Sequence, residues 1–220
     1  MTKSSRLVIR QLGEISYSDT LKAMQTFTEY RNSDTDDEIW LLQHPPVFTM
    51  GRTGKDEHIL VKTNIPVIQT DRGGDITYHG PGQIIAYVLI DLRRRQQGVR
   101  QFVNALEDVV IKTLSHWELA AKRVKNGPGV YVGDAKIASI GLRVQKGCSY
   151  HGISLNVSMD LSPWSLVKPC GLDIPMTQLS DLIDSKIKKD DVIKIFTNHL
   201  CNTLSYAKKS AVTTPFSVAD

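Results

Sequence analysis

Residues 71–91 read DRGGDITYHGPGQIIAYVLID, and this stretch does most to decide what kind of domain the chain can form. Its first twelve residues hold four glycines and a proline among polar side chains. Glycine lets the backbone approach a ligand closely and adopt positive φ angles. Residues 84–90 are almost wholly apolar, which is typical of a buried strand. The stretch therefore predicts a polar binding loop at the edge of a core strand, although a tight turn into a strand would show the same spacing.

Hydrophobic periodicity indicates further strands and helices on both sides of this stretch. Residues 102–117 carry apolar side chains at helical spacing and give the clearest amphipathic helix. Two extended runs, residues 130–132 and 136–144, meet at Gly133 and Asp134 as in a β-hairpin. The other strands are expected at residues 7–11, 38–43, 47–50, 66–69 and 152–157, and the other helices at residues 18–30 and 191–206. Ser18 or Asp19 is expected to cap the first helix. This mixture predicts an α/β domain of the α+β type, a mixed sheet flanked by helices.

The length fits one large domain or two small ones, and a single catalytic domain over residues 1–220 is expected. The chain has 220 residues, of which 41% are hydrophobic, so it can bury a sizeable core. No internal repeat or linker divides it, and residues 207–220 are expected to form a flexible tail. The net charge of +4 is too weak to indicate a nucleic-acid partner by itself.

Cysteine usage and the absence of long apolar stretches favour a soluble protein of the cytoplasm. The three cysteines are an odd number with no CxxC pair, which argues for reduced thiols rather than a disulfide framework. Residues 1–15 contain no long apolar segment of a signal peptide. No stretch approaches the roughly 18 apolar residues of a membrane-spanning helix, so no membrane partner is expected.

The segment after the core strand is rich in arginine. Arg93, Arg94, Arg95 and Arg100 all lie within residues 91–100. One interpretation is a solvated surface turn. The other is a docking surface for an acidic protein partner, in which exposed charges would mainly raise the encounter rate.

Cys170 has the most suggestive setting of the three cysteines. Proline before it and glycine after it place it in a rigid turn, whereas Cys201 lies among apolar residues of the last helix and Cys148 follows a turn at Lys146 and Gly147. A nucleophilic cysteine needs an activating neighbour, because a thiol with a pKa of ~8.5 is mostly protonated at neutral pH. A buried structural role is the ordinary alternative for any single cysteine.

Three side chains could activate such a thiol. Lys136 begins a strand whose next residues are apolar or small, where partial desolvation would let a lysine act as a base; it could equally be a surface lysine at the end of a hairpin. His79 and His151 could act as bases or simply form hydrogen bonds. A zinc site from His79, His151 and Cys170 is conceivable, but the spacing matches no metal motif.

Five segments, taken together and in order, resemble the lipoyl(octanoyl) transferases, the octanoyl-[acyl-carrier-protein]–protein N-octanoyltransferases of lipoate biosynthesis. They are RGGDITYHGPGQIIAYVLIDL, PGVYVGDAKIASIGLRV, HGISLNV, LSPW and KPCGL. The resemblance extends over residues 7–172. It implies a fold similar to biotin and lipoate protein ligases, and transfer of an octanoyl group in protein lipoylation.

The resemblance also implies roles for particular residues. It places the nucleophile on Cys170, which would carry the acyl group as a thioester, and the activating lysine on Lys136. The substrate-binding positions fall on Arg72, Gly73, Gly74, Asp75, Ile76, Thr77, Tyr78 and His79, on Ser139, Ile140 and Gly141, and on Gly152, Ile153 and Ser154. No metal or other cofactor is implied, because the donor thioester is already activated.

The implied partners are proteins. Octanoyl-acyl-carrier protein is the donor, and the acceptors are lipoyl domains of 2-oxoacid dehydrogenase E2 subunits and the glycine cleavage H protein. Three alternatives stay open. An ATP-dependent lipoate or biotin ligase would form an acyl-adenylate and need no nucleophilic cysteine, a binding module would form no covalent adduct, and a cysteine hydrolase would release free fatty acid.

Overall fold

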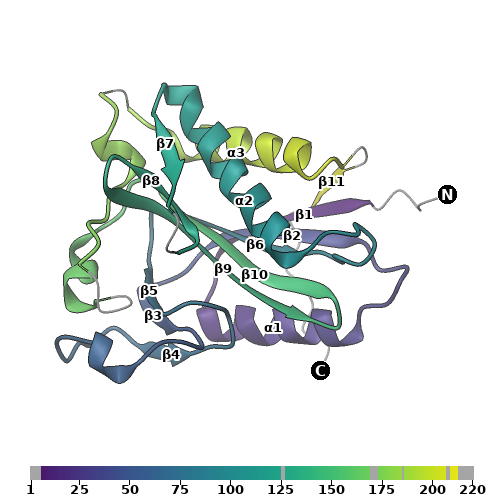
Figure 1. Cartoon of the computed structure of the whole chain (residues 1–220), viewed down its shortest axis with the longest axis horizontal. Coiled ribbons are helices and arrows are strands. Elements are labelled where there is room, and N and C mark those ends of the chain that lie inside the picture. The colour runs from purple at the N-terminus through teal and green to yellow at the C-terminus, as the bar shows by residue number, and fades with distance from the viewer. Residues whose placement is uncertain (1–5, 125–126, 169–172, 185, 207–208, 213–220) are drawn as a thin grey trace.

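A computed structural model gives the architecture of the chain and describes residues 6–124, 127–168, 173–184, 186–206 and 209–212. Over these residues the strands form two sheets (Figure 1). The strands are β1 (Leu7–Glu14), β2 (Asp37–Gln43), β3 (Val47–Met50), β4 (Val67–Gln69), β5 (Ile76–His79), β6 (Gln83–Leu89), β7 (Ala121–Arg123), β8 (Gly129–Val132), β9 (Ala135–Gln145), β10 (Cys148–Asn156) and β11 (Lys209–Val212). The α-helices are α1 (Tyr17–Tyr30), α2 (Val99–Leu114) and α3 (Lys189–Thr203), and the short 3-10 helices are η1 (Asp56–His58), η2 (Ser115–Trp117), η3 (Ser162–Leu166) and η5 (Leu179–Asp181).

The larger sheet is mixed, as the sequence predicts. In the described part of the chain it has eight strands in the order β11-β1-β2-β6-β10-β9-β8-β7. The pairs β11–β1 and β1–β2 are parallel, and the other pairs are antiparallel, including the predicted β8–β9 hairpin. The smaller sheet has the order β4-β3-β5. This architecture confirms the predicted α+β class.

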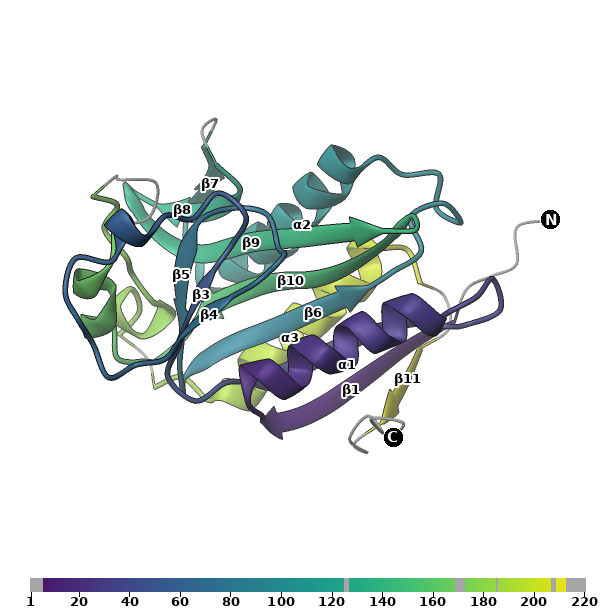
Figure 2. The same cartoon turned by 90° about the horizontal axis from the view of Figure 1, so that it is seen from below.

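Both faces of the larger sheet are covered, which explains the continuous apolar run in β6. Helices α2 and α3 lie on one face and α1 on the other (Figure 2). Residues Ile84, Ala86 and Val88 belong to the core beneath α2 and α3, whereas Ile85, Tyr87 and Leu89 belong to the core beneath α1. All residues of β6 are buried. In the described ranges no helix has the length and apolarity needed to cross a lipid bilayer.

Some element boundaries differ from the sequence predictions. Helix α1 is capped by Ser16 rather than by Ser18 or Asp19, because the Ser16 Oγ accepts a hydrogen bond from the Asp19 N–H at 3.2 Å. Within the glycine-rich stretch, Ile76–His79 form the short strand β5 and pair antiparallel with β3. In the segment expected to be a flexible tail, Lys209–Val212 instead form β11 beside β1; residues 207–208 and 213–220 lie outside the described residues.

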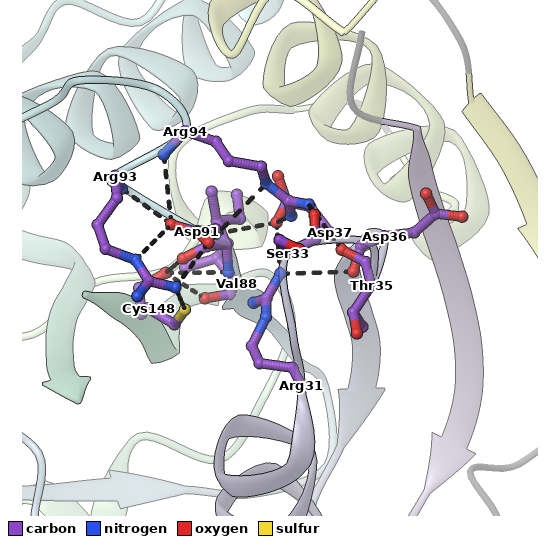
Figure 3. A network of polar contacts seen from close by, with 12 residues as sticks. Arg31, Ser33, Thr35, Asp36, Asp37, Val88, Asp91, Arg93, Arg94 and Cys148 are labelled. Carbon is purple, nitrogen blue, oxygen red and sulfur yellow. Dashed lines mark hydrogen bonds and ion pairs between the residues drawn. The ribbon is translucent and has the colours of Figure 1, made fainter. Parts of the chain in front are cut away.

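Arg94 of the arginine-rich segment takes part in an ionic network around a buried carboxylate (Figure 3). Asp37, at the start of β2, is completely buried. Its Oδ1 accepts hydrogen bonds from the guanidinium groups of Arg31 at 2.7 Å and Arg94 at 2.6 Å. Its Oδ2 accepts a hydrogen bond from the Tyr206 hydroxyl at 2.6 Å. One carboxylate thus connects the end of α1, the β6–α2 loop and the residues after α3.

The neighbouring arginines are also engaged. Arg93 forms an ion pair with Asp91 at 2.9 Å, and its guanidinium lies 3.6 Å from the sulfur of Cys148. The Arg95 guanidinium stacks on the ring of Tyr206, 5.2 Å from its centroid. Arg100 is exposed. Arg94 is only 21% exposed and is paired with Asp37, so it has a structural role in the network, and the docking interpretation of the cluster stays a prediction.

Candidate active site

The predicted substrate-binding segments converge on one cavity of about 310 Å³. It lies between the loop at residues 72–79, strands β9 and β10, and the end of β6. The residues from the sequence prediction that line it are Arg72, Gly73, Gly74, Asp75, Ile76, Thr77, His79, Lys136, Ser139, Ile140, Gly141, Gly152, Ile153 and Ser154. Segments that lie far apart in the chain therefore form one site.

The strand register explains why a trough exists on this face of the sheet. Ser154 pairs with Ile85 on one side and with Ser139 on the other, and Gly152 pairs with Tyr87 and with Gly141 in the same way. Directly paired residues of antiparallel strands project from the same face. The bulky side chains of β6 thus form a wall, and the small residues of β10 and β9 form a floor beside it.

Two glycines are required by close packing in this floor. A Cβ on Gly152 would lie 2.0 Å from the carbonyl oxygen of Ala86. A Cβ on Gly141 would lie 3.1 Å from the Arg72 side chain and 3.2 Å from the Gly73 carbonyl oxygen. The first contact is with rigid backbone, so no larger residue fits at position 152 without moving β6. The second shows how closely the loop covers β9.

Arg72 anchors that loop. Its guanidinium is buried and donates hydrogen bonds to the Thr49 carbonyl at 2.5 Å, to the Thr49 hydroxyl at 2.9 Å and to the Gly73 carbonyl at 3.0 Å. The Gly73 N–H donates to the Leu142 carbonyl at 2.8 Å. Burial lowers the pKa of Arg72 from its ordinary value, but a guanidinium stays charged in proteins. The loop therefore brings a positive charge to the cavity wall.

Asp71 fixes the other side of the loop to β10. Its Oδ1 lies 2.8 Å from His151 Nε2, and its Oδ2 accepts a short hydrogen bond from the Tyr150 hydroxyl. Burial opposes the charged carboxylate, but the hydrogen bonds from His151 and Tyr150 outweigh it and hold the pKa of Asp71 well below its ordinary value. Burial lowers the pKa of His151. His151 is thus a neutral ring whose Nε2–H donates to a carboxylate.

His79 is also neutral. Complete burial lowers its pKa to about 3. Its Nδ1 lies 2.7 Å from Gln83 Oε1 and its Nε2 lies 3.4 Å from the Thr49 hydroxyl. A base with so low a pKa holds a proton poorly at neutral pH, so the structure favours the hydrogen-bonding interpretation of His79.

Lys136 lies at the edge of the cavity, at the second position of β9. Its side chain is half-buried, and its Nζ lies 5.8 Å from the centroid of the Tyr131 ring. Gly129 makes room for it, because a Cβ there would lie 2.5 Å from Lys136 Cε. This setting is compatible with the predicted role of Lys136 in the site, and that role stays a prediction.

The backbone of Lys136 binds the segment that follows Cys170 in sequence. Its N–H donates to the Pro175 carbonyl at 2.8 Å, and its carbonyl accepts from the Thr177 N–H at 3.0 Å. Ile174 and Met176 of this segment line the cavity. Cys170 itself lies outside the described residues, so its role as the nucleophile stays a prediction.

The other two cysteines do not line the cavity. Cys148 is buried at the start of β10, where burial raises the pKa of its thiol. Cys201 is buried in α3, in the core beneath the opposite face. Among the described side chains, no group of three or more histidines, cysteines and carboxylates is arranged to hold a metal ion. The zinc site considered from the sequence would also need Cys170, which lies outside the described residues.

Comparison with known proteins identifies the family. Residues 16–201 match the family model described as the lipoyl protein ligase A/B catalytic domain. An octanoyltransferase of Pectobacterium atrosepticum is 50% identical over 203 residues, which cover 92% of this chain and 89% of that protein. The chain belongs to the octanoyltransferase family. The family predicted from the sequence motifs is thereby confirmed.

Solved structures show that the fold of this octanoyltransferase extends to ligases. A bi-partite lipoate protein ligase from Thermoplasma acidophilum superposes with a TM-score of 0.74 at 16% identity, covering 96% of this chain and 88% of that chain. Biotin protein ligase from Aquifex aeolicus, in complex with biotin and ATP, gives a TM-score of 0.57 at 14% identity, covering 90% and 70%. These likenesses confirm the predicted fold.

Tyr78 is the exception among the described positions predicted to bind substrate in this octanoyltransferase. Its ring packs against Phe48 at 5.4 Å and edge-to-face against Trp164 at 6.0 Å, in the core of the smaller sheet. Successive side chains of a strand point to opposite faces. Tyr78 accordingly faces away from its neighbours Thr77 and His79, which line the cavity.

Several residues that line the octanoyltransferase cavity were not predicted from the sequence. Described members of this group are Tyr17, Ile85, Tyr87, Val99, Val103, Gly127, Pro128, Tyr131, Leu142, Trp164, Ile174 and Met176. Tyr87 carried a signal, because it is the one polar-tipped side chain inside an otherwise apolar strand. Its hydroxyl lies 2.7 Å from His44 Nε2, and burial lowers the pKa of His44 to about 4. The other residues in this list are brought to the cavity by tertiary contacts, so no local sequence pattern indicates them.

Proposed function

We propose that this octanoyltransferase transfers the octanoyl group through a thioester on Cys170, with Lys136 as the proton-transfer group. The observation that carries the proposal is the position of Lys136 in the lining of the cavity, hydrogen-bonded through its backbone to the segment that follows Cys170. Family membership supplies the reaction, and the trough supplies space for an apolar acyl chain. Burial of each methylene of that chain contributes about 0.8 kcal/mol.

The reaction has two balanced steps. Lys136, as the neutral amine, takes the proton of the Cys170 thiol, and the thiolate attacks the carbonyl carbon of the donor thioester. The C–S bond to the donor breaks, and the departing thiolate takes that proton from Lys136. The acceptor lysine amine then attacks the Cys170 thioester, Lys136 accepts the amine proton, and Cys170 leaves as a thiolate that is reprotonated.

The oxyanion formed in each step needs nearby donors. The Gly73 N–H is already committed to the Leu142 carbonyl, so it does not serve. The buried Arg72 guanidinium adds positive charge to the wall of the cavity and favours an anionic intermediate there.

The proposed donor is octanoyl-acyl-carrier protein, and the proposed acceptors are lipoyl domains of 2-oxoacid dehydrogenase E2 subunits and the glycine cleavage H protein. The proposed location is the cytoplasm, where these proteins and reduced cysteines occur together. No nucleotide is needed, because a thioester already carries an activated acyl group. This distinguishes the proposal from the ligases that share the fold.

Transfer without nucleotide tests the proposal. The purified protein, octanoyl-acyl-carrier protein and an unmodified lipoyl domain are mixed with EDTA and without ATP, and the lipoyl domain is examined by intact mass spectrometry. We expect a mass increase of one octanoyl group. Transfer from free octanoate that requires ATP would support a ligase. Release of octanoate without acceptor would support a hydrolase, and no reaction with or without ATP would support a binding module. Each of these results would contradict the proposal.

A further inference from the structure

A buried ion pair lies between the substrate loop and η1. Asp75 lines the cavity, whereas His58 lies outside the residues assigned to the reaction. His58 Nδ1 is 2.7 Å from Asp75 Oδ2, and the side chains are 11% and 4% exposed. The second carboxylate oxygen of Asp75 accepts a hydrogen bond from the Ile76 N–H at 2.5 Å. Asp75 therefore fixes the start of β5 with one oxygen and holds His58 with the other.

The backbone around His58 holds a second segment. The His58 carbonyl accepts a hydrogen bond from the Lys168 N–H at 2.8 Å, and the Leu60 N–H donates to the Leu166 carbonyl at 2.9 Å. Between these bonds, Ile59 and Val167 form an antiparallel bridge. Residues 58–60 thus pair with residues 166–168, and Lys168 is two positions before Cys170 in the sequence.

A further contact joins the same two parts of the molecule. Tyr78 of β5 packs edge-to-face on Trp164 of η3. This explains why Tyr78 turns away from the cavity, and it gives the residues before Lys168 a second contact with the substrate loop. The ion pair and the aromatic pair together connect the loop at residues 72–79 with residues 162–168.

We propose that the His58–Asp75 ion pair positions residues 166–168 relative to the substrate loop and thereby sets the rate of acyl transfer. The inference rests on the proposed function, in which the loop holds the acyl chain and the segment after Lys168 carries the nucleophile. Reacting groups must be held in a narrow range of geometry, and a misplacement of about 1 Å is enough for a loss of about 10²-fold. His58 and Asp75 are positioning residues, since the proposal gives them no contact with the reacting atoms.

The ordinary alternative is a purely structural role. A carboxylate buried in the fold needs a partner, and removing that partner destabilises a protein whatever the site does. A stability measurement alone does not separate the two roles. The difference appears when the carboxylate is removed as well.

The test compares three variants with the parent in single-turnover acylation by a small-molecule octanoyl thioester, followed by intact mass. We expect His58→Leu to slow acylation by about 10–100-fold, mainly in the maximal acylation rate rather than in the thioester concentration that gives half of that rate. His58→Gln, whose amide can still donate to Asp75, should recover most of the rate. Glu57→Gln is the matched control: Glu57 is 68% exposed and lies 3.9 Å from His58, and its rate should match the parent.

The double variant His58→Leu/Asp75→Asn decides between the roles. It removes the buried carboxylate together with the histidine, so its thermal stability should return towards that of the parent and it carries the test if His58→Leu fails to fold. We expect its acylation to stay as slow as that of His58→Leu. Recovery of the rate together with the stability, or a His58→Leu rate within threefold of the parent, would overturn the inference. A parent enzyme that forms no adduct at all would instead refute the proposed function itself.

Discussion

Lys136→Arg is expected to be almost as inactive as Lys136→Ala, with both half-reactions slowed by about 10²–10⁴-fold. Arginine keeps the positive charge that could stabilise a nearby thiolate, but it does not give up a proton because its pKa is above 12. If Lys136 transfers protons, the positive charge that arginine retains does not restore the rate. Single-turnover acylation and aminolysis, measured separately by mass spectrometry, give the two rates.

Lys122→Arg is the matched control, since Lys122 lies on β7 with 56% of its side chain exposed. It should leave both rates unchanged. A Lys136→Arg enzyme within a few-fold of the parent in both half-reactions would reduce Lys136 to an electrostatic role. His151 would then be the next base to examine, since the pKa of His79, lowered by burial to about 3, makes that ring too weak a base.

Asp37→Ala is expected to destabilise the fold by about 3–5 kcal/mol, because it leaves the buried Arg31 and the partly exposed Arg94 without their carboxylate. For a chain of this length that loss lowers Tm by roughly 10 °C. The side chains of Asp37 and Arg31 are 0% and 2% exposed, so little solvent can replace the lost interaction. Thermal unfolding followed by circular dichroism measures the change.

Two comparisons accompany this variant. Asp134→Ala removes a carboxylate that is 99% exposed and 3.7 Å from Lys122, and it should change Tm by less than about 4 °C, since exposed ion pairs contribute about 0–1 kcal/mol. The rate of Asp37→Ala per folded molecule, below its Tm, should match the parent, because the network of Figure 3 lies apart from the cavity residues. A Tm within 2 °C of the parent would show that the network contributes little to stability.

The elements with strong local signals could be predicted from the sequence. The apolar run of β6, the helical spacing of α2 and the turn at Gly133 each depend on neighbouring residues. Every described residue that the family motifs indicated, except Tyr78, lines the cavity, but these residues make up only about half of its lining. Tyr78 shows the limit of prediction from motifs. A motif indicates a segment, whereas the alternation of side chains along the strand decides which of them face the cavity.

The remaining features depend on contacts between distant parts of the chain. An arginine-rich segment is typical of a solvated surface, and only the fold shows that the buried Asp37 pairs with Arg94. Nothing local to Lys209–Val212 indicates that β1 offers a parallel edge. The pair of His58 and Asp75 is equally invisible in sequence, since its members are separated by a complete strand and two loops.

The site of acyl attachment tests the central claim most directly. The parent protein is incubated with octanoyl thioester without acceptor, digested, and mapped by tandem mass spectrometry, with Cys148→Ser, Cys201→Ser and Cys170→Ser treated in parallel. The account predicts one octanoyl group on the peptide containing Cys170, present in the first two variants, absent in Cys170→Ser, and discharged when a lipoyl domain is added. An octanoyl group on Cys148 or Cys201, or full transfer activity in a folded Cys170→Ser protein, would contradict it.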